Sequence, residues 1–221
     1  MSATRQQNKP RILIADDQAI VAAGVCKLLA RGCEVVGIVE DGLTLLEVAQ
    51  TLRPHIIVLE VLLPQMHGID AARRLTKLVP LSRLVFLTTQ NSPTMAIEAF
   101  HAGASAYVLK RSPPSVLRQA IQAVMKEQQF VCPLMTRDRL GAGRSGLDSD
   151  AIKRPVSSLT SRQREVLQLI AEGRGTKEVA SLLKITVKTV EFHKFKIMEQ
   201  LDLHSTVALA RCAITEGLVS P

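Results

Sequence analysis

The chain has 221 residues, of which 47% are hydrophobic and 22% are charged, and its formal net charge at pH 7 is +8. This apolar content is enough to build the cores of one or two domains, which excludes disorder over most of the chain. No apolar run reaches the roughly 18 residues that span a bilayer, and the charged start does not resemble a signal peptide. We therefore expect a cytoplasmic protein with no membrane partner, and the basic excess favours nucleic acid or another anionic surface.

The first 130 residues alternate short β-rich runs with amphipathic stretches of helical length. The expected strands are Arg11–Ala15, Val35–Val39, Ile56–Leu59, Leu84–Leu87 and Ala106–Leu109, and the expected helices are Ala19–Ala30, Leu43–Leu52, Ile69–Leu78, Thr94–His101 and Ser115–Glu127. This alternation predicts an α/β fold, a doubly wound five-stranded parallel sheet with strands buried on both faces. Because ligands bind at the carboxyl ends of such strands, functional side chains are expected directly after them.

The sequence then changes character. A segment rich in Gly, Ser, Asp and Arg, with little periodicity, predicts a linker at residues 131–156 between domains at 10–130 and 157–221. The second domain is predicted to be all-α, with four short helices: Ser161–Ala171, Lys177–Leu183, Val187–Leu201 and Thr206–Glu216. The expected capping residues are Thr160 (in a T-x-x-Q capping box), Thr176, Thr186 and Ser205, and Gly217 ends the last helix. The second and third helices, joined by a short turn, form a helix-turn-helix pattern.

Five chemically active side chains follow the predicted strands and should meet at one edge of the sheet. They are Asp16, Asp17, Glu60, Thr88 and Lys110. Two or three carboxylates together form a hard-oxygen site of the kind that holds Mg²⁺. A lysine and a threonine hydroxyl beside them suit the oxygens of a phosphoryl group.

Residues 10–130 resemble the receiver domain of bacterial response regulators, a flavodoxin-like fold. The resemblance rests on Asp16 and Asp17, L-P-x-M-x-G at 63–68, Thr88, Tyr107 and Lys110. It implies that Asp16 and Asp17 hold Mg²⁺ as a cofactor and that Lys110 pairs with phosphoryl oxygens. It also implies that Thr88 and Tyr107 are switch residues, which rearrange with Lys110 when the pocket is charged.

Glu60 departs from the receiver pattern, because the family has a phosphate-accepting Asp at this position. Glu is one methylene longer, and a displacement of about 1 Å can cost a nucleophile a factor of 10² in rate. Three interpretations stay open at this point. Glu60 imitates the charged state by pairing with Lys110, or the pocket is vestigial and a protein or small ligand controls the domain, or Glu60 is still phosphorylated, slowly.

The second domain resembles the LuxR-type DNA-binding domain of NarL/FixJ-class response regulators. The motifs lie in residues 159–218 and include L-T-x-R-Q-R-E-V-L, K-E-V-A, V-K-T-V-E-x-H and E-G-L. The resemblance implies a transcription regulator that binds double-stranded DNA. It further implies a homodimer formed through the last helix, and a sensor kinase or another regulatory input as partner.

The helix at Val187–Leu201 is the predicted recognition helix. Val190, Ile197 and Leu201 share one face and are expected to pack in the domain core. The expected DNA contacts are Lys177, Lys188, Thr189, Phe192, His193, Lys194 and Lys196. Phe192 and Phe195 are unusual for the family, and exposed aromatic side chains are costly unless they are used. Three uses stay open: contact with thymine methyl groups, packing in a dimer or against the receiver, or a protein-binding patch.

The leading prediction is a dimeric DNA-binding regulator that ordinary aspartyl phosphorylation does not control. In one state we expect the receiver to pack on the DNA-binding helices, and in another to release them. The alternative is a protein-interaction module that modulates another regulator and binds DNA weakly or not at all. No Ser/His/Asp arrangement, glycine-rich phosphate loop or catalytic metal set is present, so an independent enzyme is not expected. His55 and His67 are expected at the surface or at strand starts, without a ligand partner.

Overall fold

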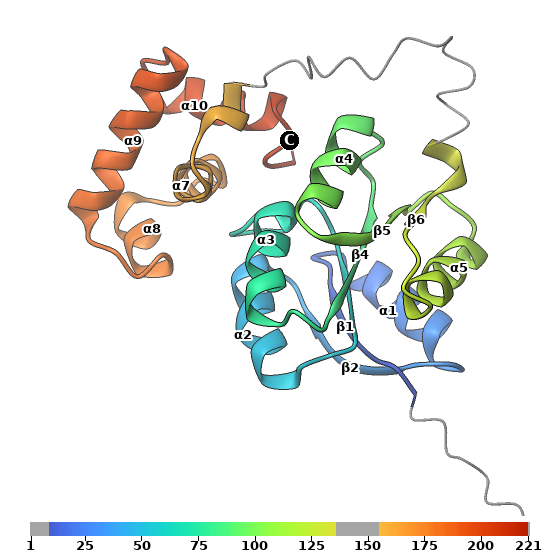
Figure 1. Cartoon of the computed structure of the whole chain (residues 1–221). Helices are drawn as coiled ribbons and strands as arrows, with labels where there is room; N and C mark the ends of the chain where they lie inside the picture. The colour runs from blue at the N-terminus through green and yellow to red at the C-terminus, as the bar shows by residue number, and fades with distance from the viewer. Residues whose placement is uncertain (1–8, 136–154, 221) are drawn as a thin grey trace, which may run out of the picture.

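A computed structural model describes residues 9–135 and 155–220. The N-terminal part is a parallel sheet in the order β2-β1-β3-β4-β5-β6 with helices on both faces (Figure 1). Its strands are β1 (Arg11–Ala15), β2 (Glu34–Val39), β3 (Ile56–Leu59), β4 (Arg83–Thr88), β5 (Ala104–Leu109) and β6 (Phe130–Val131). Its helices are α1 (Ala19–Leu29), α2 (Gly42–Leu52), α3 (Gly68–Leu78), α4 (Pro93–His101) and α5 (Pro114–Met125). The doubly wound parallel sheet is thus confirmed.

The sheet has one strand more than the five that the sequence predicted. Phe130 and Val131, at the start of the predicted linker, pair in parallel with β5. The amide of Cys132 then donates a hydrogen bond of 2.9 Å to the carbonyl of Tyr107, and both side chains are fully buried. A two-residue strand is too short for its pattern to be read, which is why the sequence did not reveal it. Most of the predicted linker, 136–154, lies outside the described residues.

The strands send alternate side chains to the two faces of the sheet. In β1, Leu13 and Ala15 pack in the core under α2, α3 and α4, and Ile12 and Ile14 pack in the core under α1 and α5. Both sets are fully buried. This period of two buries a continuous apolar run on both sides, as expected for a parallel strand covered by helices.

The loop between β3 and α3 is packed closely against its neighbours. A Cβ atom on Gly68 would lie 2.1 Å from the carbonyl oxygen of Glu60, and one on Gly42 would lie 2.3 Å from the carbonyl oxygen of Met66. The amide of Gly68 donates a 2.7 Å hydrogen bond to the carbonyl of Val61, and that of Gly42 a 3.0 Å bond to Pro64. Backbone therefore holds the loop at both ends, where no other residue type fits.

The C-terminal part consists of a short 3₁₀ helix, η1 (Pro155–Ser158), and four α-helices, as predicted. They are α7 (Ser161–Ala171), α8 (Thr176–Leu182), α9 (Val187–Leu201) and α10 (Thr206–Thr215). Val190 and Ile197 of α9 are buried in one core with Val166, Leu169 and Val179. Across the described ranges, no helix combines the length and the apolar character that a membrane span requires.

Three of the four predicted helix caps are present. Thr160 and Gln163 form the reciprocal capping box, and the hydroxyl groups of Thr186 and Ser205 accept from the third amide of their helices. The prediction for Thr176 was wrong, because Gly175 is the N-cap and Thr176 is already helical. The amide of Gly175 instead donates to Glu178 over 2.8 Å, so the carboxylate in the first turn supplies the cap.

Replacing Gly68 with alanine tests the close approach in the β3–α3 loop. The new Cβ would collide with backbone, so we expect a loss of about 2 kcal/mol or more in the free energy of unfolding. Gly24→Ala is the matched control, because a Cβ there meets no atom within 4 Å and the substitution removes a glycine from a helix. It should gain about 0.5–1 kcal/mol. Urea denaturation measures both, and equal stability of the two variants would contradict the packing described here.

Candidate functional site

Strand register brings Asp16, Glu60 and Lys110 together at the carboxyl edge of the sheet. Ala15 pairs with Leu59 and Thr88 with Leu109, so the next residue of each strand lies at the same edge. The Nζ atom of Lys110 lies 2.8 Å from Oδ2 of Asp16 and 2.9 Å from Oε2 of Glu60. The two carboxylates are only 3% exposed, so one buried ammonium group bridges two buried anions.

The remaining carboxylate oxygens also have donors. Oε1 of Glu60 accepts from the amides of Val61 (2.6 Å) and Leu62 (3.3 Å). Oδ1 of Asp16 accepts from the amide of Gln18 and from Lys110, both over 3.0 Å. Burial alone would lower the pKa of Lys110, but its hydrogen bonds to the two carboxylates and their charges raise it above the ordinary value. Lys110 is therefore held in its charged form.

These residues do not fit a resident Mg²⁺ in this arrangement. Within the described ranges, no group of three His, Cys, Asp or Glu side chains is placed to hold a metal ion. Asp16 and Glu60 are both engaged by Lys110, whose single positive charge offsets one of their two negative charges. Asp17 is exposed and lines a cavity of about 200 Å³ beside Leu63 and Glu172. The sequence thus predicted correctly that Asp16 and Glu60 are neighbours. Asp17, in contrast, faces the cavity beside Leu63 and Glu172.

The two predicted switch residues are buried, and both bond to the backbone of Gln90. Thr88 accepts a 3.1 Å hydrogen bond from the amide of Gln90 through its Oγ1 atom. The hydroxyl of Tyr107 donates to the carbonyl of the same residue over 2.9 Å, and its ring stacks on Phe86. Burial, and to a lesser degree the charge of Glu60, raises the pKa of Tyr107. Both side chains therefore fix the segment after β4.

The loop that follows Glu60 also contacts α7 of the helical part. The Nε2 atom of Gln168 donates to the carbonyl of Leu63 over 2.7 Å, and the amide of Gln65 donates to Oε1 of Glu172 over 2.9 Å. Gln168 also donates to Glu172 over 2.8 Å, so the two side chains that contact the loop are bonded to each other. Burial raises the pKa of Glu172 above its ordinary value. The loop that begins at the acidic edge is therefore hydrogen-bonded through its backbone to α7 and its C-cap.

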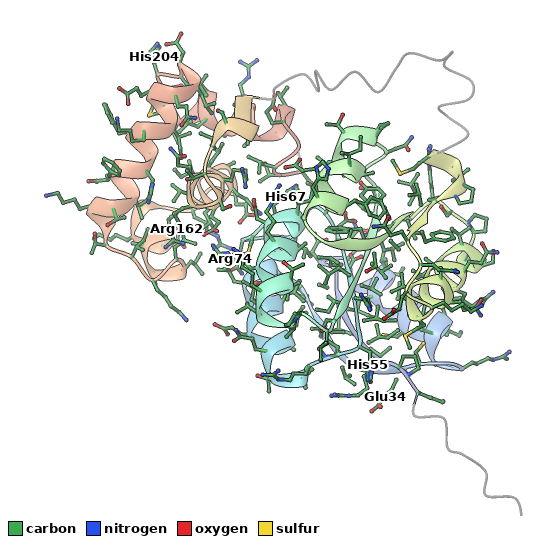
Figure 2. All side chains as sticks on the ribbon, in the orientation of Figure 1. Glu34, His55, His67, Arg74, Arg162 and His204 are labelled. Atoms are coloured by element: carbon green, nitrogen blue, oxygen red, sulfur yellow. The ribbon has the colours of Figure 1, made fainter. Side chains whose placement is uncertain are left out.

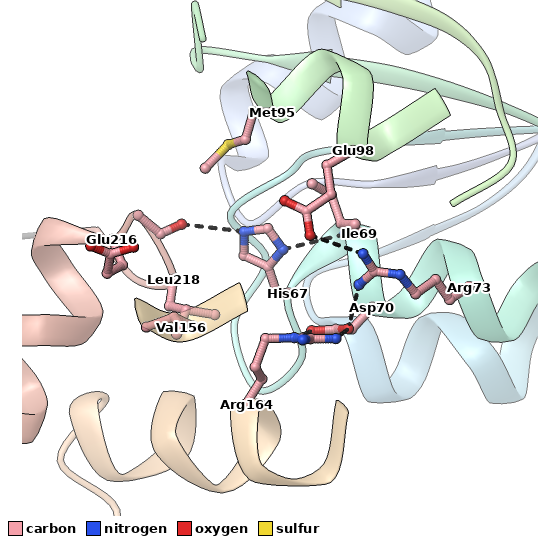
Figure 3. Close-up of a pocket in the computed structure, with 11 residues that line it drawn as sticks. His67, Ile69, Asp70, Arg73, Met95, Glu98, Val156, Arg164, Glu216 and Leu218 are labelled. Carbon is pink, nitrogen blue, oxygen red and sulfur yellow. Dashed lines mark hydrogen bonds and ion pairs between the residues drawn. The ribbon is translucent and has the colours of Figure 1, made fainter. Parts of the chain in front are cut away.

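A buried ion pair joins α3 to α7. The guanidinium of Arg164 contacts both carboxylate oxygens of Asp70, at 2.7 and 3.0 Å (Figure 3). Arg73 donates to Asp70 over 2.8 Å and to Glu98 over 2.9 Å. Burial would raise the pKa of Asp70, but the hydrogen bond and charge of Arg164 lower it below the ordinary value. The bidentate geometry therefore fixes the orientation of α7 on α3.

A second ion pair between α3 and α7 reinforces this contact. Arg74 of α3 and Arg162 of α7 both pair with Glu165, whose side chain is 1% exposed. Figure 2 shows Arg74 and Arg162 where the two parts of the chain face each other. Three residues at helical spacing, Arg164 and Gln168 of α7 and Glu172 at its C-cap, bond to the α/β part, so one face of this helix is the docking surface.

His67 lies inside this contact rather than at the surface, so that expectation was wrong. Its side chain is 7% exposed, and its Nε2 atom is 3.2 Å from the carbonyl of Gly217, at the end of α10 (Figure 3). Its Nδ1 atom accepts from the amide of Ile69, so His67 caps α3. The ring thus donates from Nε2 to Gly217 as a neutral imidazole.

The surroundings of His67 disfavour its protonation. Burial lowers the pKa of His67 below its ordinary value, and the positive charge of Arg164 acts in the same direction. The carboxylates of Asp70 and Glu98 and the bond to Gly217 oppose this shift without reversing it. The docked arrangement therefore favours neutral His67.

The predicted DNA-contacting surface is not covered by this docking. Phe192 and Phe195 of α9 are 57% and 63% exposed, and Lys188 is exposed beside them. In Figure 1, α9 lies on the side of the helical part away from the sheet. Lys177, at the start of α8, is also exposed.

The other predicted contacts are partly engaged within the helical part. Lys194 donates to the hydroxyl of Thr206 over 2.8 Å, and Lys196 pairs with Glu199 over 2.7 Å. His193 and Thr189 are half-buried. Lys177 and Lys188 are thus the exposed lysines of this surface that make no ion pair or hydrogen bond within the described residues.

Comparison with known proteins matches both parts of the chain. Residues 12–122 match the family model of the response regulator receiver domain, and residues 157–213 match that of bacterial regulatory proteins of the luxR family. The chain is 30% identical over 214 residues to the oxygen regulatory protein NreC of Staphylococcus carnosus, covering 95% of this chain and 99% of that protein. The chain is a response regulator. Its receiver and its LuxR-type domain place it in the NarL/FixJ class.

Solved structures of RcsB are similar to this response regulator over nearly its whole length. RcsB from Salmonella enterica serovar Typhimurium, bound to promoter P1flhDC with the phosphomimetic BeF₃⁻, has 26% identity and a TM-score of 0.61, covering 94% of this chain and 100% of that one. A structure of two RcsB dimers bound to two parallel DNAs has 26% identity and a TM-score of 0.56, with 93% and 98% covered.

Sequence reasoning missed the residues that join the two domains of this response regulator. The main ones are His67, Asp70, Arg164, Gln168 and Glu172. Asp70 and Arg164 are 94 residues apart, and charged residues on amphipathic helices are ordinarily solvated, so neither stood out. His67 lies within the L-P-x-M-x-G segment, whose placement after the third strand was the one available signal.

Removing the charge of Lys110 tests the bridge at the acidic edge of the receiver. Lys110→Met would leave two buried carboxylates facing each other, so we expect a loss of about 3–5 kcal/mol in the free energy of unfolding. The double variant Lys110→Met/Glu60→Gln should recover at least about 1 kcal/mol of this loss.

Arg83→Met is the matched control for this experiment. It breaks the ion pair with Glu127, whose side chain is 77% exposed, and it should cost about 1 kcal/mol or less. Chemical denaturation measures all four proteins. A similar small cost for Lys110→Met and Arg83→Met would contradict a buried charge bridge.

Acidification should loosen the docking of the two domains. Because the docked state lowers the pKa of His67, the undocked state binds more protons, and docking weakens as the pH falls through about 6.5. The raised pKa of Glu172 acts in the opposite sense, but nearer its ordinary value of 4.5. Small-angle X-ray scattering should therefore show a larger radius of gyration at about pH 5.5 than at about pH 7.5.

His67→Gln separates this effect from other titrations, since glutamine keeps a donor for Gly217 but does not titrate. This variant should stay compact at both pH values. His204→Gln is the control, because its side chain is 88% exposed, and it should expand like the parent protein. An equal expansion of His67→Gln would rule out His67 as the cause.

Proposed function

We propose that this protein is a cytoplasmic DNA-binding transcription regulator whose receiver functions without ordinary aspartyl phosphorylation. The observation that carries the proposal is the 2.9 Å ion pair between Glu60, at the position of the phosphate acceptor, and Lys110. By the resemblance, Lys110 is the residue that pairs with phosphoryl oxygens. Here a carboxylate of the chain itself supplies the negative charge that a phosphoryl group would bring.

Two features favour this mimicry over the other interpretations. A vestigial pocket has no reason to keep Asp16 and Lys110 buried and paired, because buried ion pairs are costly to desolvate. Slow phosphorylation needs a free nucleophilic oxygen, whereas both oxygens of Glu60 already accept from Lys110 or from the amides of Val61 and Leu62. Glu60 is thus better placed to bind the lysine than to attack a phosphodonor.

The docking of the domains supports activity in this state. The sequence suggested that the receiver packs on the DNA-binding helices in one state, and α7 is the helix that it contacts. The recognition helix α9 keeps its outer face exposed, with Phe192 and Phe195 more than half accessible. We infer that the docked arrangement can present α9 to the major groove of DNA.

The proposed DNA contacts combine positioning and base reading. Lys177 and Lys188 carry exposed charges that suit phosphate oxygens. Lys188 also lies on the face of α9 that would enter the DNA groove. Thr189, Phe192, His193, Lys194 and Lys196 complete the set. The similarity to RcsB, which is described in complexes with DNA, supports this part of the proposal.

The proposed homodimer uses α10. Val207 is 70% exposed and Ile214 is 38% exposed on this helix, and Arg211 lies between them on the same face. An exposed apolar stripe at helical spacing suits packing against a second copy. Two recognition helices would then reach two half-sites about one helical turn of DNA apart.

One observation favours the alternative, a protein-interaction module. Phe192 and Phe195 form an exposed aromatic pair, and the ammonium of Lys196 lies 5.9 Å from the ring centre of Phe195. Aromatic side chains are enriched at protein interfaces. If DNA affinity proves weak and insensitive to salt, this surface becomes the candidate site for a partner protein.

DNA binding by the unmodified chain tests the proposal. With duplexes selected from a random pool, we expect specific binding whose affinity falls steeply as salt rises, because bound cations are released from phosphates. Adding the phosphoryl analogue beryllofluoride with Mg²⁺ should change the affinity by less than about twofold, since Lys110 is already paired. Fluorescence anisotropy measures these affinities.

Matched variants make the result specific. Lys188→Ala should weaken binding by about tenfold and reduce the salt dependence, whereas Lys126→Ala, an exposed lysine at the end of α5, should have no effect. Glu60→Asp shortens the side chain and makes room for the analogue, so its binding should respond to beryllofluoride. An increase of about tenfold or more with the unmodified chain would show that the pocket still switches.

A further inference from the structure

A groove on the receiver lies away from the docked helical domain. It runs between α1 and α5, on the face of the sheet opposite α2, α3 and α4, and reaches the carboxyl edge at Lys110. Figure 1 shows α1 and α5 on the side of the sheet away from α7–α10. Its volume is about 640 Å³, against about 40 and 200 Å³ for two cavities between the domains. Pockets for drug-sized ligands span about 300–1,000 Å³.

The inner surface of the groove is apolar. Leu87 and Val108 of the central strands form its floor, Val21 and Leu28 of α1 form one wall, and Leu117 of α5 forms the other. This combination of a hollow and an apolar lining is typical of sites that bury the body of a small molecule.

Gly24 leaves one position on the α1 side of the groove without a side chain. A Cβ at this position would meet no atom within 4 Å, so packing does not require glycine there. A glycine inside a helix costs about 0.5–1 kcal/mol relative to alanine. The absence of a side chain at Gly24 leaves the groove open over one turn of α1.

The groove carries positive charge and no negative charge. Its lining includes Lys27, Arg31, Lys110 and Arg118, and no Asp or Glu. Lys110 is neutralised by Asp16 and Glu60, but the other three are exposed, and no ion pair joins them to a carboxylate of the described residues. An occupant with an anionic group is therefore favoured, and the attraction weakens with salt.

A second copy of the chain fits this groove poorly. In a two-fold dimer the same patch meets itself, so Lys27, Arg31 and Arg118 of the two copies would face each other. An acidic helix of another protein would match the charge, but a volume of about 640 Å³ lies within the range of pockets for drug-sized ligands. The size and the charge together suit a small molecule.

We propose that this groove binds a free amphipathic anion, a molecule with an apolar body and one carboxylate or similar group. The body lies on Val108 and Leu117, and the anionic group lies among Lys27, Arg31 and Arg118. Because Lys110 lines the groove and its ammonium pairs with Glu60, an occupant lies against the residue that bridges the acidic edge. Binding itself is independent of the proposed DNA function, and it is measured without DNA.

Dodecanoate is the probe, titrated into the full chain by isothermal titration calorimetry below its micelle concentration. We expect saturable binding of one molecule per chain that weakens as salt rises. Dodecyltrimethylammonium, with the same chain length and the opposite charge, should bind at least about tenfold more weakly. Equal binding of the two would overturn the proposal.

Two variants assign the binding to the groove. Gly24→Leu fills the open turn and should weaken dodecanoate binding at least about tenfold, while Gly24→Ala should bind like the parent protein. Lys27→Glu/Arg118→Glu should have an effect as large as Gly24→Leu, and Lys126→Glu, outside the groove, should have little. Thermal unfolding checks that each variant folds. Undiminished binding by a folded Gly24→Leu would place the ligand elsewhere and refute the site.

Other occupants give different results. Anionic phosphatidylglycerol vesicles should not sediment the protein, because a concave groove admits a free molecule and not a bilayer surface. Sedimentation that Lys27→Glu/Arg118→Glu abolishes would identify a membrane as the occupant. Dimerisation abolished by the same variant would identify a second copy. Either result would overturn the proposal of a free ligand.

Discussion

The charge of Lys110 is the constraint on which the carboxyl edge of the receiver depends. Asp16 and Glu60 are buried side by side, and two such carboxylates repel each other strongly unless a cation or a proton lies between them. Lys110 supplies the cation from within the chain, over 2.8 and 2.9 Å. A pocket whose two carboxylates are already bridged by an internal cation has less need of an added metal ion or phosphoryl group to reach a single conformation.

The consequences of this pairing extend along the β3–α3 loop. Glu60 holds the amides of Val61 and Leu62, and the backbone of the next residues meets Gln168 and Glu172 of α7. The loop has little freedom to adjust, because Gly68 and Gly42 pack against backbone. Side chains at the acidic edge are therefore connected to the LuxR-type domain through one short, tightly held segment, and the outer face of α9 stays exposed on the far side.

The sequence was informative where a pattern repeats or a motif has fixed spacing. Alternating strands and helices revealed the parallel sheet, and strand ends correctly placed Asp16, Glu60 and Lys110 at one edge. The T-x-x-Q pattern located the start of α7. Contacts between domains have no such signature, so the pairing of Asp70 with Arg164 and the burial of His67 required the structure. The sixth strand, Phe130–Val131, was too short to show a period.

Amide hydrogen exchange of the Gln65 backbone amide, which donates to Glu172 of the other domain, tests the central claim most directly. The measurement compares the full chain with Glu60→Gln, in which the charge on Lys110 loses one partner. If the Glu60–Lys110 pair holds the loop against α7, Gln65 exchanges faster in the variant, together with Val61 and Leu62. If only Val61 and Leu62 respond and Gln65 stays protected, the acidic edge is not coupled to the DNA-binding domain.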